Sequence, residues 1–259
     1  MSWKWRLTWS VDRDHECLGS LWWKHRLSKM KIKQLHSWRV STSDASNLQQ
    51  VLSKQLITDT PVSIQKIRTI AAADVSFNRF SNILYAAVVL FTFPDLELHS
   101  VYIEKYETNF PYIPGYLSFR EAPPILKLFH KIKLIPDVLL CDGQGIAHPR
   151  RLGLASHLGL FLDLPSIGCA KSVLVGEYQE PTAGKGSYSY LYYQESIVGA
   201  ALRTREKVKP VYVSPGHKID LRSAIRIILK CSPKFRIPEP LRVAHQKVNE
   251  MRRSDGHKE

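Results

Sequence analysis

Two aspartates at the ends of apolar segments are the residues best suited to chemistry in this chain. Asp74 follows the apolar run at 70–73, and Asp142 follows the apolar run at 138–141. A charge at the end of a buried strand costs several kcal/mol unless it is paired or binds a metal. Neighbouring strands lie about 4.8 Å apart, so if these two segments are adjacent their carboxylates converge and require a divalent cation. Such oxygen ligands suit Mg²⁺ or Mn²⁺, and a salt bridge from each aspartate to an arginine is the alternative.

The loop after the second aspartate carries groups that bind phosphate. Gly143 and Gly145 lack a Cβ, so the backbone can approach a ligand closely at these positions. His148, Arg150 and Arg151 follow within a few residues, and the planar fork of arginine donates paired hydrogen bonds to phosphate oxygens. A solvated loop could have the same composition. An acid, close-approach backbone and arginines in one loop nevertheless indicate chemistry on a phosphate.

Three further residues could complete such a site. Glu121 lies at the start of an expected helix, where an acid is also common for helix stability alone. Lys171 interrupts the apolar segment at 166–174, and burial would disfavour its charge, so a purely structural role for it is hard to explain. His245 lies on the last expected helix, where a polar residue on the helix flank is the ordinary case.

The elements that position these residues can be predicted from hydrophobic patterning. Three consecutive strand-like segments are joined by connectors short enough for hairpins, which predicts an antiparallel meander. A stiff loop with two prolines follows, and then helices and strands alternate. This order predicts an α/β fold with a mixed sheet, three antiparallel strands and then parallel strands, flanked by helices on both faces. The predicted strands are 69–77, 83–93, 98–106, 138–141, 166–174, 188–193 and 197–202.

The helices are predicted from apolar spacings of three and four residues and from their caps. Thr42 or Ser43 caps the first, Pro123 lies in the first turn of the second, and a third begins at about Arg151. Asp220 caps a fourth, and the helix that carries His245 begins after Pro238.

The chain divides into one large core and two short ends. Residues 30–253 show no linker and no internal repeat, so we expect a single catalytic domain. Residues 1–29 hold five of the six tryptophans without a helical or strand period, which indicates a non-core extension, with a start assigned too far upstream as one origin. A base-stacking arm is the alternative for this segment. Residues 254–259 are expected to be a polar tail.

Charge and cysteine usage restrict the class of protein. The net charge is +14 and the pI is near 9.7, which favours a polyanionic partner, either nucleic acid or an anionic membrane surface. The four cysteines form no C-x-x-C pair, which indicates a reducing compartment and no structural zinc. No apolar run is long enough for a membrane span and no secretory signal is visible, so we expect no membrane association and a cytoplasmic location.

At the acids singled out above, the chain resembles the endonuclease V family of deoxyinosine-directed nucleases. The resemblance covers about residues 30–253 and implies an RNase H-like fold, in agreement with the predicted order of elements. Six segments match in family order: Ala73-Asp-Val-Ser-Phe, Pro111-Tyr-Ile-Pro-Gly-Tyr-Leu-Ser-Phe-Arg-Glu121, Asp142-Gly-Gln-Gly-Ile-Ala-His-Pro-Arg-Arg-Leu-Gly, Gly168-Cys-Ala-Lys-Ser172, Val213-Ser-Pro-Gly-His217 and Ile237-Pro-Glu-Pro-Leu-Arg-Val-Ala-His245.

The resemblance implies a role for each candidate residue of the metal site. Asp74, Glu121 and Asp142 would be the metal-binding acids, holding Mg²⁺ with Mn²⁺ as a substitute. One or two ions would polarise the scissile phosphate and activate the attacking water. Lys171 would lie near that phosphate and water, and His245 would lie beside the metal site. All five would be catalytic residues.

The resemblance also implies how DNA is held. The loop of Pro111, Tyr112, Ile113 and Pro114 would be a wedge, with Tyr112 entering the duplex where the modified base leaves the stack. Contacts to DNA phosphates would come from the loop after Asp142, and the flipped base would be read largely by backbone groups. The expected phosphate contacts are His148, Arg150 and Arg151, and the expected base-pocket positions are Gly115, Leu117, Gly143 and Gly145.

The implied activity is hydrolysis of the second phosphodiester bond 3′ to a deoxyinosine, leaving 3′-hydroxyl and 5′-phosphate ends. The partner would be DNA containing deoxyinosine, bound by a monomer. One alternative is cleavage of inosine-containing RNA by the same metal chemistry, which only contacts to a 2′-hydroxyl would distinguish. Another is a protein that binds flipped inosine without cutting, although the presence of all three acids and Lys171 argues against it.

Overall fold

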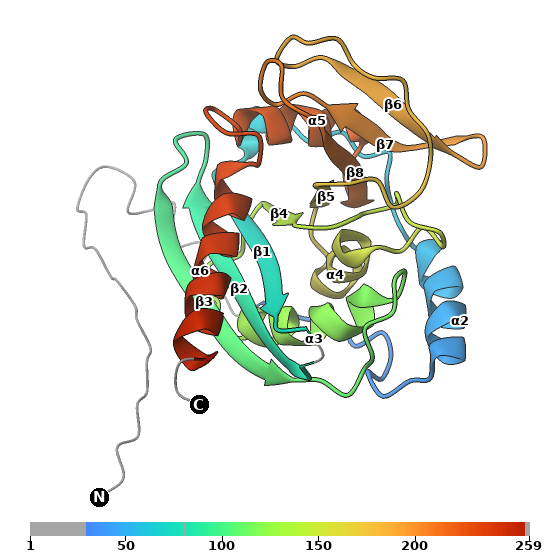
Figure 1. Cartoon of the computed structure of the whole chain (residues 1–259), viewed down its shortest axis with the longest axis vertical. Coiled ribbons are helices and arrows are strands. Elements are labelled where there is room, and N and C mark those ends of the chain that lie inside the picture. Colours follow the sequence, from blue (N-terminus) through green and yellow to red (C-terminus); the bar gives the residue numbers. More distant parts are fainter. Residues whose placement is uncertain (1–29, 80, 257–259) are drawn as a thin grey trace, which may run out of the picture.

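An eight-stranded mixed sheet forms the centre of the protein, with the strands in the order β3-β2-β1-β4-β5-β8-β7-β6 (Figure 1). The computed structural model describes residues 30–79 and 81–256, so the predicted extension at 1–29 lies outside the described residues. The strands are β1 (Thr69–Phe77), β2 (Ile83–Thr92), β3 (Leu98–Glu107), β4 (Val138–Cys141), β5 (Ser166–Ala170), β6 (Tyr188–Tyr193), β7 (Ser196–Leu202) and β8 (Val211–His217). The helices are α2 (Thr42–Ser53), the 3₁₀ helix η1 (Ile64–Lys66), α3 (Leu117–Phe129), α4 (Leu154–Leu162), α5 (Leu221–Lys230) and α6 (Glu239–Gly256).

The pairing of the strands confirms the predicted fold class. β1, β2 and β3 form the antiparallel meander, and β4 and β5 extend the sheet parallel to β1. β8, β7 and β6 then pair antiparallel to one another, and β8 is antiparallel to β5. Three antiparallel strands followed by parallel ones, with helices on both faces, is the expected α/β, RNase H-like arrangement.

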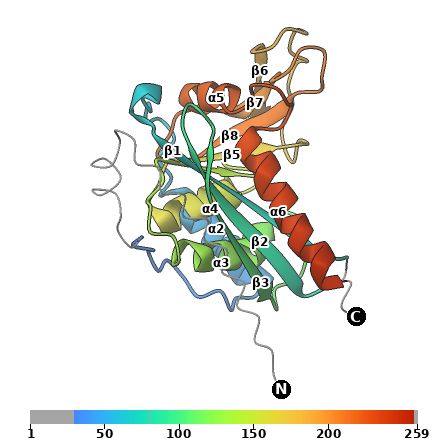
Figure 2. The ribbon, with the colours of Figure 1, turned by 90° about the vertical axis from the view of Figure 1, so that its left-hand side faces the viewer.

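Helices cover the sheet on both faces, as the side view shows (Figure 2). One apolar cluster joins the sheet to α5 and α6, and a second joins the opposite face to α3 and α4. β4 lies in the middle, and its four residues are buried, with Leu140 in the first cluster and Leu139 in the second. A short strand buried on both faces is a rigid support for the residue that follows it, which is Asp142.

Several element boundaries differ from the predicted ones. The cap of α2 is Ser41, which forms a capping box with Asp44, rather than Thr42 or Ser43. α3 begins at Leu117, so Pro123 lies in the second turn, where its missing N–H removes an intrahelical bond. The predicted cap of α5 is confirmed, because Asp220 accepts a hydrogen bond from the backbone N–H of Ser223.

The last helix is longer than expected. α6 extends to Gly256, so the first residues of the predicted polar tail are helical, and 257–259 lie outside the described residues. Asp255 explains the difference, since the Tyr85 hydroxyl donates to its carboxylate at 2.5 Å and Lys105 pairs with the same oxygen at 2.5 Å. These contacts fix the end of α6 to β2 and β3. No helix among the described residues is long and apolar enough to cross a membrane.

Candidate active site

Strand pairing brings the two aspartates of the predicted metal site together. β1 and β4 are parallel neighbours, with Ala73 opposite Cys141, so Asp74 and Asp142 leave the same edge of the sheet. The backbone N–H of Asp142 donates to the carbonyl of Ala73 at 3.2 Å, which fixes this register at the site itself. One ligand atom each from Asp74, Asp142 and His245 lie within 4.8 Å of one another. The predicted convergence of the two carboxylates is therefore present.

His245 reaches this site from α6, on the α5–α6 face of the sheet. Its Nδ1 lies 2.7 Å from Asp74 Oδ2, so it donates to the carboxylate, and Asn249 lies one turn later with its amide 3.3 Å from Nε2. The hydrogen bond to Asp74 raises the pKa of His245, and the charges of Asp74 and Asp142 act in the same direction. The imidazole is thus poised to carry a proton beside the two carboxylates.

Lys171 lies on the other side of the carboxylate pair. Its Nζ is 2.5 Å from Asp142 Oδ2, and its side chain is 43% exposed. The expectation that Lys171 interrupts a strand was wrong, because β5 ends at Ala170 and the lysine follows it. Burial and the charge of Asp74 raise the pKa of Asp142, while Lys171 opposes that effect. The ammonium group is therefore held at the open edge of the site, within reach of a bound phosphate.

Glu121 contributes its charge from α3, on the opposite face. It is the fifth residue of the helix rather than the first, and it does not belong to the group within 4.8 Å. Burial and the carboxylates of Asp74 and Asp142 raise its pKa to about 8, so all three acids share one electrostatic environment. With all three acids ionised, their negative charge exceeds the positive charge of Lys171 and a protonated His245. That donor set fits a divalent cation.

The predicted wedge projects beside this centre. The Tyr112 side chain is 57% exposed, Pro111 and Pro114 are exposed, and Ile113 is partly buried. The Tyr112 ring centroid lies 5.7 Å from that of Phe77, at the end of β1, three residues beyond Asp74. An exposed aromatic ring on a proline-stiffened loop beside the metal site is well placed to enter a nucleic acid stack.

Buried polar contacts support the wedge from both ends. At its start, the buried Arg120 donates to the carbonyl of Phe110 at 2.6 Å and to that of Ser81 at 2.6 Å. At its end, the carbonyl of Gly115 accepts three hydrogen bonds, from Gln49 at 3.0 Å, His148 at 2.9 Å and Arg150 at 2.8 Å. The wedge is thus a preorganised loop rather than a free one.

These contacts change the interpretation of His148 and Arg150. His148 is 4% exposed, and both ring nitrogens are engaged, Nε2 with Gly115 and Nδ1 with the backbone N–H of Arg150. Burial, reinforced by Arg150, lowers the pKa of His148 to about 4, which matches a neutral ring. These contacts give His148 a structural role in this protein, and its contact to phosphate stays a prediction. Arg150 also bonds Gln49 at 2.5 Å and stacks on Tyr116, so most of its fork serves the protein itself.

Arg151 makes fewer side-chain hydrogen bonds than Arg150. Its backbone is left-handed, with φ of 58°. Its guanidinium donates to the carbonyl of Tyr193 at 2.9 Å and lies over that ring. Among the described residues its side chain makes no other hydrogen bond, and its role toward phosphate stays a prediction.

The four predicted base-pocket positions differ in what they can offer a base. Gly145 is buried, donates its N–H to Ser214 Oγ at 2.7 Å and accepts from Gly153 at 2.9 Å, so its backbone is already used. A Cβ at position 145 would lie 2.0 Å from the carbonyl oxygen of Pro215, so glycine is required there by the packing of the backbone. Gly115 has its carbonyl occupied, as described above. Gly143, with φ of 156°, directly follows Asp142 and is partly exposed, as is Leu117 at the start of α3.

Sequence reasoning missed three supporting residues. Gln49 is fully buried on α2, and it follows Ala45 and precedes Leu52 at spacings of four and three, the positions that face the core. A polar residue at such a position was a usable signal. The signal for Arg120 was weaker, since it is only a basic residue next to Glu121. For Asn249, one turn after His245, the only signal was its spacing.

Comparison with known proteins gives one consistent answer. A family model described as endonuclease V matches residues 50–246. An endonuclease V from Trichormus variabilis is 49% identical over 215 residues, covering 83% of this chain and 97% of the relative. One from Dictyoglomus turgidum is 50% identical over 213 residues, covering 82% of this chain and 91% of the relative.

Solved structures agree with the sequence relatives. Endonuclease V from Streptomyces avermitilis superposes with a TM-score of 0.81 at 36% identity, covering 85% of this chain and 96% of that one. Endonuclease V from Ciona intestinalis, crystallised with DNA containing an inosine followed by a ribo-adenosine, has a TM-score of 0.73 at 28% identity, covering 82% of this chain and 98% of that one.

Proposed function

The chain belongs to the endonuclease V family and is a deoxyinosine-directed DNA repair nuclease, and from this premise we propose how it cuts. It hydrolyses the second phosphodiester bond 3′ to the deoxyinosine and leaves 3′-hydroxyl and 5′-phosphate ends. The observation that carries the proposal is the convergence of Asp74 and Asp142 at one sheet edge, with His245 within 4.8 Å and Lys171 bonded to Asp142. The Ciona intestinalis relative crystallised with inosine-containing DNA supports the choice of partner.

Asp74, Asp142 and Glu121 would hold the metal, which we propose to be Mg²⁺, with Mn²⁺ as a substitute. Their oxygen donors suit these ions. Burial, and then the charges of Asp74 and Asp142, raise the pKa of Glu121, and a bound cation would offset the repulsion among these carboxylates. When bound, the ion supplies Lewis-acid polarisation of the phosphate and lowers the pKa of the attacking water.

The other residues of the site act on the proton and the phosphate. Lys171 offers an ammonium group at the open edge, where it can pair with a non-bridging phosphate oxygen. His245 donates from Nδ1 to Asp74, so it orients that carboxylate and can hold a proton at Nε2. Tyr112 occupies the position of the departing base, and Gly143 and Leu117 lie next to the acids, where backbone groups can meet the flipped hypoxanthine.

Compartment and assembly follow from simpler observations. Cys141, Cys169 and Cys231 are buried free thiols, which suits a reducing compartment, and we place the activity in the cytoplasm. One chain supplies all five residues of the proposed site, so a monomer suffices for cutting.

The test uses a labelled duplex with a single deoxyinosine and its inosine-RNA equivalent, each with Mg²⁺ and with EDTA. We expect a Mg²⁺-dependent nick one nucleotide beyond the DNA lesion. Asp74→Asn and Asp142→Asn should each reduce the rate by about a thousandfold, because a bound metal ion supplies several kcal/mol. The matched control is Asp59→Asn, an exposed aspartate before Thr60, which should cut like the wild type. An Asp74→Asn variant with wild-type activity would overturn the metal site.

Inosine-containing RNA is the second candidate substrate. The nucleotide after the inosine in the Ciona intestinalis complex is a ribonucleotide, so that relative accommodates a 2′-hydroxyl at this position. Cleavage of the RNA alone would move the function to RNA. Inosine-dependent binding with no cut in either nucleic acid would indicate a binding protein instead.

A further inference from the structure

A row of three exposed tyrosines runs along β6, at the opposite end of the sheet from β3. Tyr188, Tyr190 and Tyr192 are 44%, 41% and 50% exposed, whereas Leu191 between them is buried. The ring centroids are 5.7 Å apart for the first pair and 6.4 Å apart for the second, so the three rings form one continuous surface. We call these three residues the tyrosine row. The proposed cutting reaction does not use it.

The backbone edge beside the tyrosine row is already covered. Tyr192 and Glu177 exchange both backbone hydrogen bonds, each at 2.9 Å, and the Ser189 hydroxyl donates to the carbonyl of Gln179. An extended peptide could therefore not add to β6 as a further strand along this stretch. What the hairpin presents to a partner is its side chains.

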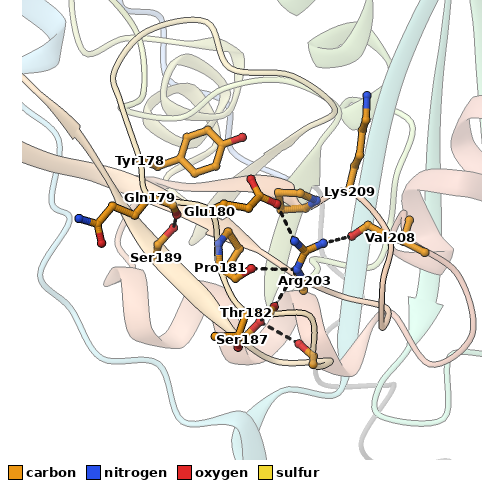
Figure 3. Close-up of polar contacts among 12 residues, drawn as sticks. Tyr178, Gln179, Glu180, Pro181, Thr182, Ser187, Ser189, Arg203, Val208 and Lys209 are labelled. Atoms are coloured by element: carbon orange, nitrogen blue, oxygen red, sulfur yellow. Dashed lines mark hydrogen bonds and ion pairs between the residues drawn. The ribbon is translucent and has the colours of Figure 1, made fainter.

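Arg203 holds that covering segment in place (Figure 3). Its guanidinium donates to the carbonyls of Thr182 at 2.7 Å and Val208 at 2.6 Å, and it pairs with Glu180 at 2.6 Å. Figure 3 shows these partners converging on Arg203 from two loops. The strand that carries the tyrosine row is thus braced, and its rings lose little conformational entropy when they bind a ligand.

A line of positive charge lies on the neighbouring helix. Arg222, Arg226 and Lys230 follow one another at spacings of four on the exposed side of α5, and we call them the basic ridge. Like charges at this spacing destabilise a helix. Within 30–79 and 81–256, none of the three forms an ion pair with a carboxylate. Such an arrangement favours a polyanion as the missing partner.

The tyrosine row and the basic ridge share one face of the sheet. Tyr188 lies opposite Leu202 and Tyr190 opposite Ala200, and both partners belong to the apolar cluster under α5. Arg222 is close enough to lower the pKa of the Tyr188 phenol, against the larger upward effects of the Tyr190 hydrogen bond and burial. Figures 1 and 2 both show α5 beside the β6–β7 hairpin.

We propose that the tyrosine row and the basic ridge form a binding surface for single-stranded nucleic acid. Unpaired bases stack on aromatic rings without regard to sequence, and a neighbouring cationic line follows the phosphates. The stacked bases of a duplex would not reach these rings. The charge of the ridge selects a polyanion over an apolar protein surface, and the covered strand edge leaves no room for β-addition.

The surface is separate from the metal site but can serve the same strand. Tyr190, Ala200, Val213 and Cys169 lie in register across β6, β7, β8 and β5, and β5 pairs with β4 just before Asp142. Four strand spacings of about 4.8 Å put the row about 19 Å from the end of β4. The inference deepens the proposed function, because unpaired nucleic acid flanking an inosine would be held there, but binding itself requires no inosine.

The first test measures binding of a fluorescent oligo-dT strand of about 20 nucleotides without inosine or metal, longer than common single-strand sites. Replacing all three tyrosines by serine should weaken binding by roughly tenfold or more, because each ring lost removes a stacking partner. The matched variant with three phenylalanines keeps the rings and should bind within about twofold of the wild type. Wild-type affinity in the serine variant, or an equal loss in the phenylalanine variant, would overturn the proposal.

The second test separates the basic ridge from net charge. A triple variant Arg222→Gln, Arg226→Gln and Lys230→Gln should weaken oligo-dT binding and reduce its salt dependence. The control removes the same charge at or just beyond the C-terminal ends of α2 and α3, on the other side of the sheet from α5, and should bind within about twofold of the wild type. Its substitutions are Lys54→Gln, Lys127→Gln and Lys131→Gln. Equal losses of oligo-dT affinity in both variants would mean that binding depends on net charge and not on the basic ridge. That result would contradict the proposal.

Nicking of a short deoxyinosine duplex distinguishes this proposal from the previous one. A folded serine variant, checked by circular dichroism, should nick the short duplex at the wild-type rate, because the duplex does not extend to the row. Loss of nicking together with loss of oligo-dT binding would show that the row is not a separate site. If the wild type nicks no substrate, the proposed nuclease function is wrong. The oligo-dT measurements would still test the proposed single-strand binding surface.

Discussion

At the scale of single residues, the proximity of three acids changes the protonation of Glu121. Burial and the carboxylates of Asp74 and Asp142 raise its pKa to about 8, so the metal-free protein holds a proton there at neutral pH. A divalent ion displaces that proton when it binds, because it needs the carboxylate. Metal affinity should therefore increase with pH up to about 8.

The same residue makes a prediction about stability. A carboxyl whose pKa is raised on folding destabilises the folded state increasingly as pH rises from 4.5, the ordinary value, to about 8. Glu121→Gln removes this effect, so in EDTA its melting temperature should exceed that of the wild type by an amount that grows across this window. Thermal melts at several pH values measure the difference. Glu97→Gln, at an exposed turn, is the control, and a difference that does not change with pH would contradict the raised pKa.

Substitution of Arg150 and substitution of Arg151 should affect the salt dependence of DNA binding differently. Arg150 is engaged with Gln49 and Gly115, whereas Arg151 contacts only Tyr193 among the described residues, through one donor and its ring. If Arg151 binds a phosphate, Arg151→Gln lowers the slope of log Kd against log salt by about one. Arg150→Gln should leave that slope unchanged while weakening lesion binding. Equal slopes in wild type and Arg151→Gln would remove Arg151 from the phosphate contacts.

At the scale of elements, the wedge depends on a helix that lies outside the predicted site. α2 begins at a capping box, and its buried Gln49 bonds the carbonyls of Gly115 and Leu152 as well as Arg150. One amide therefore joins the wedge to the loop after Asp142. Any shift of α2 changes the distance between the proposed wedge and the loop that we propose to contact phosphate.

Gln49→Leu tests this connection. The substitution removes the acceptor of the Arg150 Nε–H and the donor to the Leu152 carbonyl, which costs about 1–3 kcal/mol for each group left unsatisfied. The Gly115 carbonyl keeps its hydrogen bonds from His148 and Arg150. We expect KM for the deoxyinosine duplex to rise several-fold more than kcat falls, since the wedge is loosened while the metal site is intact. Gln50→Leu, the exposed neighbour, should match the wild type in both constants. A fall in kcat alone would place Gln49 in the chemistry instead.

At the scale of the whole molecule, the site holds together elements from both faces of the sheet. Asp74 and Asp142 come from the sheet, Glu121 from α3 on one face and His245 from α6 on the other. A cation bound between them therefore links layers that otherwise meet only through the strands. Binding to the folded state alone stabilises it, by about 2.7 kcal/mol at a hundredfold excess over Kd.

Mg²⁺ should accordingly raise the melting temperature by several degrees at pH 8 and by less at lower pH, where Glu121 retains its proton. The comparison is made between saturating Mg²⁺ and EDTA. The shift should vanish in Asp74→Asn and in Asp142→Asn, and it should persist in Asp59→Asn. A shift of equal size in all four proteins would mean that the ion binds elsewhere.

The meander of β1 to β3 could be predicted from local patterns, and so could the convergence of the acids on the condition that their strands are neighbours. The order of the other strands was not predicted, and β8 was not predicted as a strand. An apolar run as short as β4, ending in an acid, has few places in a sheet, and hairpin connectors determine β1 to β3. The environment of Lys171 could not be predicted, since no pattern shows where a strand ends within an apolar run. The burial of His148 and Gln49 could not be predicted for another reason. Their burial depends on contacts with residues 33 or more positions away, which periodicity does not contain.

The placement of His245 has a consequence during synthesis. Residues 74, 121, 142 and 171 leave the ribosome well before α6, which is the last helix of the chain. Domains fold from the N-terminal side as they emerge, so the acids can meet while the imidazole that orients Asp74 is still in the exit tunnel. We therefore expect ribosome-bound chains stalled before α6 to lack the complete proposed site, and cutting to begin after α6 emerges and Tyr85 and Lys105 fix its end.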